Sequence, residues 1–486
     1  MKIALSLLFL ILVTKNGAVT NDAEEGHDIP CETNELPYAC GSKGICRCNE
    51  TRKGYSIDCS RRQLHNLSLV IPPNVTFANF SRNYLSLIPK DTFRLTTSLN
   101  LLNISRNKIS ELHDETFYYT TQLTALYIND NVLTKLPTTI FKKLVNLSIL
   151  YINHNFLTQL PTTIFKKLVH LSTLDLSYNK LTSLPKGLFE NTTSLKSLYI
   201  NDNFLTQLPT NIFQKLVNVS KLTLSYNNLT SLPKGLFDNT TSLTSLCIND
   251  NFLTQLSTNI FQKLVHLSKL DLSFNNLTSL PIGLFDNTTS LEFLYISDNF
   301  LTQLPTNIFQ KLVNLSKLML VSNKITYLPE GMFQSFKNLS IIYLSNNKIE
   351  TLSNTSLLGL NLVHHITFYG NNLSSLPAGL FETINLTFSL DLSNNSLSVI
   401  PRGLFSAYGG NHGLSILQLQ RNKLTCLWND TFQGLGSLAY LILNRNLIHS
   451  IAELAFLDTH LKCLYLVANN ISNVSNNSFA LENIDM

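Results

Sequence analysis

The sequence contains little charge and none of the short motifs that mark common catalytic sites. Only 14% of its 486 residues are charged, and the formal net charge is +5 at pH 7, so a strong basic footprint for nucleic acid is missing. Nucleophile elbows, HExxH sequences and phosphate-binding loops are missing too. We therefore predict that the protein is not an enzyme, uses no cofactor or metal ion, and has no nucleic-acid partner.

Long apolar runs are also absent, apart from one at the N-terminus. A membrane-spanning helix needs about 20 apolar residues in succession, and polar residues interrupt every later apolar stretch. Residues 1–20 combine Lys2 with an apolar run from Ala4 to Val13 and small residues near a plausible cleavage point, which is the layout of a secretory signal. The sequence predicts a secreted, extracellular protein without membrane insertion, whose mature chain begins with an acidic, flexible arm over residues 21–30.

What the sequence has in abundance is one repeated unit. The stretch from Leu198 to Asn218 reads LYINDNFLTQLPTNIFQKLVN and follows the pattern LxxLxLxxNxLxxLPxxxF. Fourteen copies recur at an unbroken step of 24 residues, and three more follow at steps of 27, 24 and 23 residues. The asparagines that align the copies are Asn83, Asn107, Asn131, Asn155, Asn179, Asn203, Asn227, Asn251, Asn275, Asn299, Asn323, Asn347, Asn371, Asn395, Asn422, Asn446 and Asn469.

A fixed period with this leucine pattern is the signature of a leucine-rich-repeat solenoid. One unit cannot bury its own apolar residues, so LxxLxLxxN must form a short strand whose leucines, such as Leu198, stack on those of the next unit. The asparagine follows at a sharp turn, where its amide can satisfy backbone groups that no sheet ladder reaches. The predicted fold is an α/β-type horseshoe of about 17 repeats over residues 75–480, with a parallel β-sheet on the concave face.

Five of the eight cysteines lie within thirty residues, just before the repeats. Cys40, Cys46, Cys48 and Cys59 follow the spacing C-x5-C-x-C-x10-C, which indicates disulfides in a secreted chain. Zinc is the weaker alternative, because the usual two-residue gap between ligands is missing. We expect a disulfide-bonded cap over residues 31–74 that covers the open edge of the first strand.

This cluster, followed by SRRQLHNLSLVIPPN and by repeats that end in LTSLPKGLFDNTTS, resembles the extracellular leucine-rich-repeat proteins with a cysteine-rich N-terminal cap. Variable lymphocyte receptors, Toll-like receptor ectodomains, Slit-type guidance proteins and the ectodomains of leucine-rich-repeat G-protein-coupled receptors belong to this group. The resemblance covers residues 40–480 and implies the disulfides Cys40–Cys48 and Cys46–Cys59. The cysteines left without an assigned partner are Cys31, Cys247, Cys426 and Cys463.

The C-terminal end departs from that resemblance. Such arrays usually close with a second cysteine cap, but residues 481–486 form only a short tail after the last repeat. The alternatives are a truncated gene product, a fragment of a longer receptor, or a form that dimerises through this uncapped end.

Candidate binding residues come from the positions that the leucine pattern leaves exposed on the concave face. One is the residue between the two inward leucines, and the other directly precedes the asparagine. We expect both on the sheet, where strands lie about 4.8 Å apart and tyrosine offers a large contact area with few rotors to freeze. A cationic or amide-rich ligand could stack on these rings and bond the acids, although duplication could equally have copied a merely solvated face. The candidates are Tyr127, Tyr151, Tyr199, Tyr295, Tyr343, Asp130, Asp202, Asp250 and Asp298.

The sequence has 22 N-x-S/T glycosylation signals, the acceptor motif of secreted proteins. In the middle of the array none falls on the concave positions, whereas Asn79 and Asn103 mark its first two repeats. The candidate glycosylation sites are Asn49, Asn66, Asn146, Asn191, Asn239, Asn287, Asn338 and Asn429.

These observations predict a secreted protein that binds an extracellular protein or glycan through its concave face, in innate recognition, adhesion or guidance. The alternative is an ectodomain fragment of a Toll-like or G-protein-coupled membrane receptor whose anchor and signalling parts are missing. Transcript sequence beyond Met486 would separate the two, because a receptor would add a second cap and a membrane helix.

Overall fold

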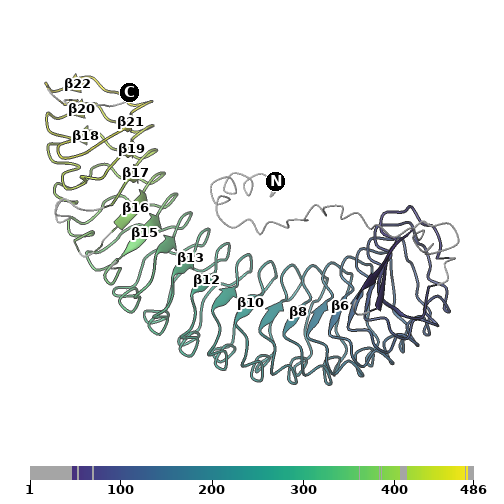
Figure 1. Ribbon diagram of the computed structural model, residues 1–486. Coiled ribbons are helices and arrows are strands. Elements are labelled where there is room, and N and C mark those ends of the chain that lie inside the picture. The colour runs from purple at the N-terminus through teal and green to yellow at the C-terminus, as the bar shows by residue number, and fades with distance from the viewer. Residues whose placement is uncertain are drawn as a thin grey trace. The chain divides into compact units, whose positions relative to one another are not determined.

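The computed structural model describes residues 46–51, 54–67, 71–360, 362–382, 384, 386–405, 413–476 and 478–479. The predicted leader, the acidic arm, Cys31, Cys40 and residues 481–486 lie outside the described residues. Within these ranges the chain is a coil of about 17 turns of 24 residues, and the stack of turns is curved (Figure 1). The predicted leucine-rich-repeat solenoid is therefore confirmed.

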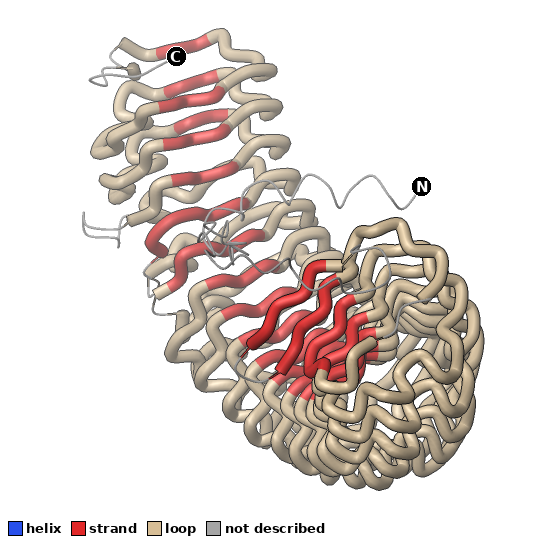
Figure 2. Tube along the Cα trace, turned by 45° about the vertical axis from the view of Figure 1, so that its right-hand side comes forward, coloured by secondary structure: helices blue, strands red, loops and turns tan. Residues whose placement is uncertain are grey.

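Each turn contributes one short strand to a continuous sheet of 19 strands. Figure 2 shows these strands aligned along one side of the coil, while loops and turns make up the other sides. In order they are β1 (Arg47–Thr51), β2 (Gly54–Asp58), β3 (Val75–Asn79), β4 (Leu101–Asn103), β5 (Ala125–Tyr127), β6 (Ile149–Tyr151), β7 (Thr173–Asp175), β8 (Ser197–Tyr199), β9 (Lys221–Thr223), β10 (Ser245–Cys247), β11 (Lys269–Asp271), β12 (Phe293–Tyr295), β13 (Lys317–Met319), β14 (Ile341–Tyr343), β15 (Val363–Thr367), β16 (Leu386–Asp391), β17 (Ile416–Gln418), β19 (Tyr440–Ile442) and β21 (Cys463–Tyr465). A second sheet of three strands contains β18 (Cys426–Leu427), β20 (Ser450–Ile451) and β22 (Asn473–Val474).

The sheet is in register because every turn places the same residue type at the same height. Leu246 pairs with Leu222 on one side and with Leu270 on the other, and all three side chains are buried. Opposite the sheet, phenylalanines of successive turns stack with ring centroids 6.2 to 6.5 Å apart, among them Phe213 and Phe237. Leucines thus fill the sheet side of the core and phenylalanines fill the far side.

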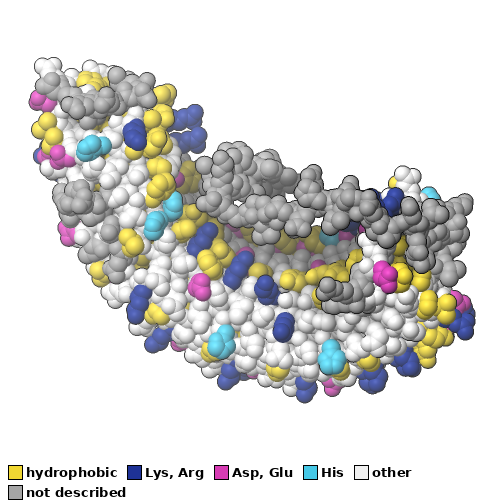
Figure 3. Space-filling view, in the orientation of Figure 1, with side chains coloured by type: hydrophobic (Ala, Val, Ile, Leu, Met, Phe, Trp, Pro, Cys, Tyr) yellow, Lys and Arg dark blue, Asp and Glu magenta, His cyan; other side chains and the backbone are white. Residues whose placement is uncertain are grey.

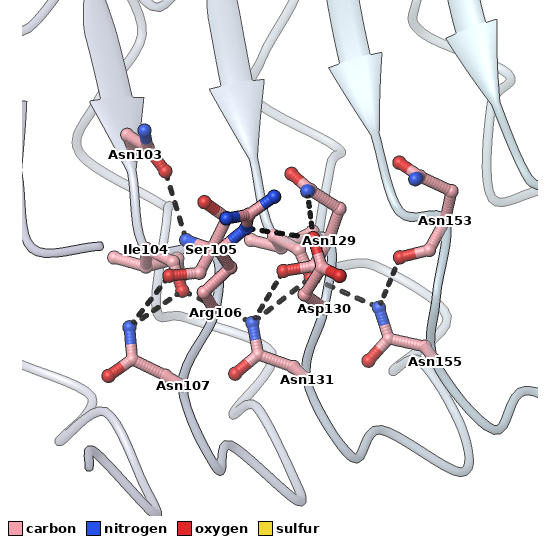
Figure 4. Close-up of polar contacts among 11 residues, drawn as sticks. Asn103, Ile104, Ser105, Arg106, Asn107, Asn129, Asp130, Asn131, Asn153 and Asn155 are labelled. Carbon is pink, nitrogen blue, oxygen red and sulfur yellow. Dashed lines mark hydrogen bonds and ion pairs between the residues drawn. The ribbon is translucent and has the colours of Figure 1, made fainter. Parts of the chain in front are cut away.

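Asparagine ladders hold the turns together where each strand ends (Figure 4). The side-chain oxygen of Asn203 accepts the backbone N–H of Leu181 at 3.0 Å. Its side-chain nitrogen donates to the carbonyls of Leu176, at 3.0 Å, and of Ile200, at 3.2 Å. Since Leu176 and Leu181 belong to the preceding turn, one buried amide joins two turns at the bend, where strand pairing stops.

The N-terminal cap is a hairpin of β1 and β2, and β2 pairs in parallel with β3. A disulfide joins Cys46 to Cys59, which is one of the two bridges that the family resemblance implies. Cys48 is disulfide-bonded as well, and its expected partner, Cys40, lies outside the described residues. The hairpin therefore covers the edge that β3 would otherwise leave open.

At the other end, the last described turn presents apolar side chains that inner turns bury. Leu441 and Leu443 are fully buried, whereas their equivalents one turn on, Leu464 and Leu466, are only half-buried.

Among the described residues, no helix is long and apolar enough to cross a membrane.

Replacing Asn203 with alanine should lower the free energy of unfolding by about 1 to 3 kcal/mol, because buried backbone groups of two turns lose their partners. A urea titration of both proteins measures the change. Asn211→Ala is the matched control, because Asn211 is an exposed asparagine in the same repeat. Equal unfolding free energies for the Asn203 and Asn211 variants would show that the ladder amide is dispensable.

Candidate functional site

The first row of candidate residues stands at the last position of the strands from β3 to β14. Tyr127 pairs with Tyr151, Asp175 with Tyr199, and Asp271 with Tyr295. We call this row the strand column. Its members are half-buried by their neighbours rather than fully exposed, because side chains on adjacent strands stand close together. The strand column includes Asn79, Asn103, Tyr127, Tyr151, Asp175, Tyr199, Thr223, Cys247, Asp271, Tyr295, Met319 and Tyr343.

The second row lies outside the strands, contrary to the sequence-based expectation. Asp202, directly before its ladder asparagine, follows the end of β8 by three residues. Its backbone is left-handed, with a φ of 54°, and the equivalent residues of successive turns have φ values from 51° to 54°. The chain must bend sharply here to bring the asparagine inward, and a strand conformation would not allow that bend. We call this row the turn column; it contains Asp130, His154, Tyr178, Asp202, Tyr226, Asp250, Phe274 and Asp298.

A shallow groove runs along the N-terminal half of the strand column, so the sheet forms the hollow side of the coil. It brings together three of the predicted tyrosines, Tyr127, Tyr151 and Tyr199, whereas Tyr295 and Tyr343 lie outside it. We call this feature the concave groove. Its lining residues are Ser81, Arg82, Asn103, Ser105, Arg106, Tyr127, Asn129, Tyr151, Asn153, Asp175, Ser177, Tyr199 and Asn201.

Two arginines and three asparagines of the groove escaped the sequence analysis. Arg106 forms an ion pair with Asp130, with 3.7 Å between Nε and Oδ2, and the neighbouring guanidiniums of Arg61 and then Arg106 lower the pKa of Arg82. Asn129, Asn153 and Asn201 each stand two residues before a ladder asparagine, in the recurring sequence YIN. The recurrence of YIN was the sequence signal that could have identified these three asparagines. With them and the arginines, the groove contains aromatic rings, amide groups and a cationic N-terminal end.

The tyrosines of the strand column differ in their surroundings. The rings of Tyr127 and Tyr151 pack together with centroids 5.2 Å apart, and burial raises the pKa of Tyr151. The ring of Tyr295 instead lies between the ammonium groups of Lys269 and Lys317, at 5.6 and 5.7 Å. A cationic ligand at Tyr295 would therefore have to displace these two lysines of the chain itself.

The carboxyl groups fall into two sets with different partners. In the strand column, the Oδ1 atoms of Asp175 and Asp271 accept the backbone N–H of the serine two residues later, at 2.9 and 3.0 Å. In the turn column, Asp202 and Asp250 each accept a hydrogen bond from the asparagine that precedes them, both at 2.8 Å. Burial raises the pKa of Asp175, Asp250 and Asp271. The first set thus bonds the backbone just past the strands, whereas the second bonds the side chain of a neighbouring asparagine, and all four carboxyl groups are half-buried.

Most of the candidate glycosylation sites lie at the surface, away from the groove. Asn49, Asn66, Asn239, Asn287, Asn338 and Asn429 are exposed, and Asn146 and Asn191 are half-buried. Asn103 does line the groove, and its side-chain oxygen accepts the N–H of Ser105 at 3.0 Å.

In the part of the chain that the structure describes, no group of three or more His, Cys, Asp or Glu could hold a metal ion. Among the cysteines that the structure describes, Cys247, Cys426 and Cys463 are free thiols.

Figure 3 shows charged side chains scattered over the face in view, without one dominant patch. A parallel-sheet coil with a groove along its strands defines a class: the repeat solenoid that presents an extended binding surface.

Comparison with family models identifies the family. The leucine rich repeat model matches residues 79–133, 121–181, 145–203, 169–229, 313–373 and 389–448. The model of the BspA type leucine rich repeat region matches residues 206–336. Because these matches span more than half of the chain, the chain belongs to the leucine-rich-repeat family. A search of curated proteins found no match.

Several solved structures have a similar fold. The leucine-rich-repeat protein LIC12759 of Leptospira interrogans is 25% identical, with a TM-score of 0.62 over 84% of this chain and 93% of that one. Toll in the glycosylated Toll–Spatzle complex of Drosophila is 23% identical, with a TM-score of 0.66 over 90% of this chain and 61% of that one. The octameric complex of Latrophilin 3, Unc5D and FLRT2 yields 25% identity and a TM-score of 0.50, over 58% of this chain and 85% of that one.

The Asp271→Asn variant should be more stable than the wild type at neutral pH. Because burial raises the pKa of Asp271 in the folded chain, folding favours the protonated carboxyl. That contribution is fully present below the unfolded pKa of about 4 and is lost as the pH rises through the raised folded value. Asparagine keeps the oxygen that accepts the N–H of Ser273, as Asn103 does for Ser105, and it carries no charge.

Thermal unfolding at pH 7 and pH 3 measures this effect. The protein must come from cells that do not glycosylate, because the change creates an N-L-S signal. We expect a higher midpoint for the variant at pH 7 and equal midpoints at pH 3. A difference of the same size at both pH values would contradict the electrostatic explanation.

Proposed function

We propose that this protein is secreted and binds an extracellular protein or glycan through the concave groove. The observation that carries the proposal is the convergence of Tyr127, Tyr151 and Tyr199 with Arg82 and Arg106 along one groove. Tyrosine and arginine are the residue types that most often dominate binding energy at interfaces. The amides beside them supply donors and acceptors that suit either a peptide backbone or sugar hydroxyls.

Similar proteins support a binding role. Leucine-rich-repeat solenoids use their curved surfaces for recognition, and the leucine-rich-repeat part of FLRT2 occurs in a complex with Latrophilin 3 and Unc5D. The likeness to Toll supports the fold alone. The ligand of this chain is proposed from the groove itself, whose rings and amides favour a ligand with flat apolar faces and many hydrogen-bonding groups.

Secretion is supported by two independent features. The N-terminal residues have the layout of a secretory signal, and the Cys46–Cys59 disulfide belongs to a type of bond that persists in oxidising compartments. The exposed glycosylation signals fit the same compartment.

An unbiased screen tests the proposal. The protein, secreted from cultured animal cells and tagged at its C-terminus, is presented to arrays of extracellular protein domains and of glycans. We expect at least one partner whose binding saturates and persists at physiological salt.

The affinity for that partner should fall by about 2 kcal/mol or more in Tyr199→Ala and in Tyr151→Ala if these rings are hot spots. Since both side chains are half-buried, each change should cost stability of only about 1 kcal/mol. Titration calorimetry and thermal unfolding measure the two effects separately. Tyr327→Ala is the matched control, because Tyr327 is an exposed tyrosine outside the groove. If both groove variants bind as tightly as the wild type and the Tyr327 variant loses binding, the binding site lies outside the groove.

A further inference from the structure

A row of aromatic side chains lies exposed beside the sheet, at the position directly after the ladder asparagine. It was not among the candidate residues of the sequence analysis. Rings here are exposed although the repeat could place any polar residue at this position. We call this feature the aromatic row; it consists of Tyr84 (44% exposed), Phe156 (41%), Phe204 (51%), Phe252 (50%) and Phe300 (42%).

Three of these rings are covered by a lysine from the next turn. The Nζ atom of Lys108 lies 5.0 Å from the ring centroid of Tyr84. The corresponding distances are 4.7 Å from Lys180 to Phe156 and 4.5 Å from Lys324 to Phe300. An ammonium group is attracted to the negative face of an aromatic ring. In these three turns, therefore, a lysine of the chain itself covers one face of the ring.

The backbone fixes this arrangement. The N–H of Lys180 donates to the carbonyl of Leu157 at 2.9 Å, and the N–H of Lys324 donates to Leu301 at the same distance. Each acceptor is the residue directly after the covered ring. The backbone of the residue at the lysine position therefore lies at the same place relative to the ring of the preceding turn.

Phe204 and Phe252 have a different neighbour at that position. It is Asn228 beside Phe204 and Asn276 beside Phe252, and their N–H groups make the same bond to the residue after the ring, at 2.9 Å in both cases. Both asparagines begin the sequence N-L-T, an N-glycosylation signal. Among the described residues, neither side-chain amide makes a hydrogen bond, whereas that of Asn239 donates to Gln214 at 3.0 Å. The two rings without a lysine are also the two most exposed of the row.

We propose that Asn228 and Asn276 carry N-linked glycans whose first sugar lies on Phe204 and Phe252, in the place that lysine takes in the other turns. This proposal rests on the secretion of the protein. The sugar is attached at Nδ2, so its ring begins about as many bonds from Cα as the lysine ammonium does. The C–H face of a sugar ring, which carries partial positive charge, complements the negative face of phenylalanine.

The attachment requires a polyprenyl-diphosphate oligosaccharide and the transferase of the secretory pathway. A bond forms between Nδ2 of the asparagine and C1 of the first sugar, and the bond between C1 and the diphosphate oxygen breaks. The amide loses one proton to a base, and the polyprenyl diphosphate leaves with the bonding electrons. The second Nδ2 hydrogen remains, so the linked nitrogen can still donate one hydrogen bond.

The glycans would cover the phenylalanine surface that Phe204 and Phe252 leave exposed on this side of the coil. Exposed apolar surface favours association. With sugars over Phe204 and Phe252 and lysines over the other three rings, every ring of the aromatic row has one face covered. This side of the coil is thereby closed to partners, whereas Asn103 is the one lining residue of the concave groove that begins an acceptor signal.

Glycopeptide mass spectrometry of the protein secreted from animal cells measures occupancy. We expect glycans on most copies of Asn228 and Asn276. Occupied Asn191, Asn239 and Asn287 with bare Asn228 and Asn276 would overturn this inference and leave secretion standing. A secreted chain without any occupied signal would overturn this inference alone, whereas absence of the protein from the medium would contradict the proposed secretion.

Hydroxyl-radical footprinting of the full chain then tests the position of the sugar. Oxidation of Phe204 should rise severalfold in Asn228→Gln, which removes the glycan, and should stay low in Asn228→Lys, which restores the arrangement of Lys180 and Phe156. Phe156 is the internal control, because its oxidation should be equal in all three proteins. Unchanged oxidation of Phe204 in Asn228→Gln, from a protein shown to carry the glycan, would overturn the stacking.

Discussion

The structure depends on the hydrogen bonds of one buried amide per turn. At the point where each strand ends, the chain must bend inward, and the bend leaves backbone groups without sheet partners. The asparagine satisfies groups of its own turn and of the preceding one, as Asn203 does with Ile200, Leu176 and Leu181. Because the same bonds repeat from turn to turn, leucines and phenylalanines stack in register, and the coil can lengthen without a new core.

The same constraint decides which residues face solvent. With the asparagine directed inward, the residues on either side of it must point away from the core. The residue before it adopts a left-handed backbone and forms the turn column, and the residue after it forms the aromatic row. The side chains available for contact with a partner are therefore those that the asparagine ladder leaves at the surface. Side chains of neighbouring turns also contact one another, as Lys269 and Lys317 contact Tyr295.

The buried framework could be predicted from the sequence because burial repeats with the period. Leu198, Asn203 and Phe213 occupy their expected places, and the strand column falls on the sheet as expected. The turn column was misplaced, because the alternation of a strand does not reveal where the strand stops. The environment of Tyr295 depends on Lys269 and Lys317, which stand one turn away on either side. Such contacts between turns depend on long side chains, which a pattern of buried positions does not describe.

The central claim is that ligand binds in the concave groove. It is tested most directly by placing a glycan there as a steric block and measuring affinity for the first partner isolated. Tyr151→Asn with Asn153→Thr creates an acceptor signal inside the groove, and Lys215→Asn with Val217→Thr creates one at exposed positions outside it. With both sites shown to be occupied, the account predicts that the groove glycan abolishes binding and that the other leaves it unchanged. Binding that survives the groove glycan and is lost with the outer one would contradict it.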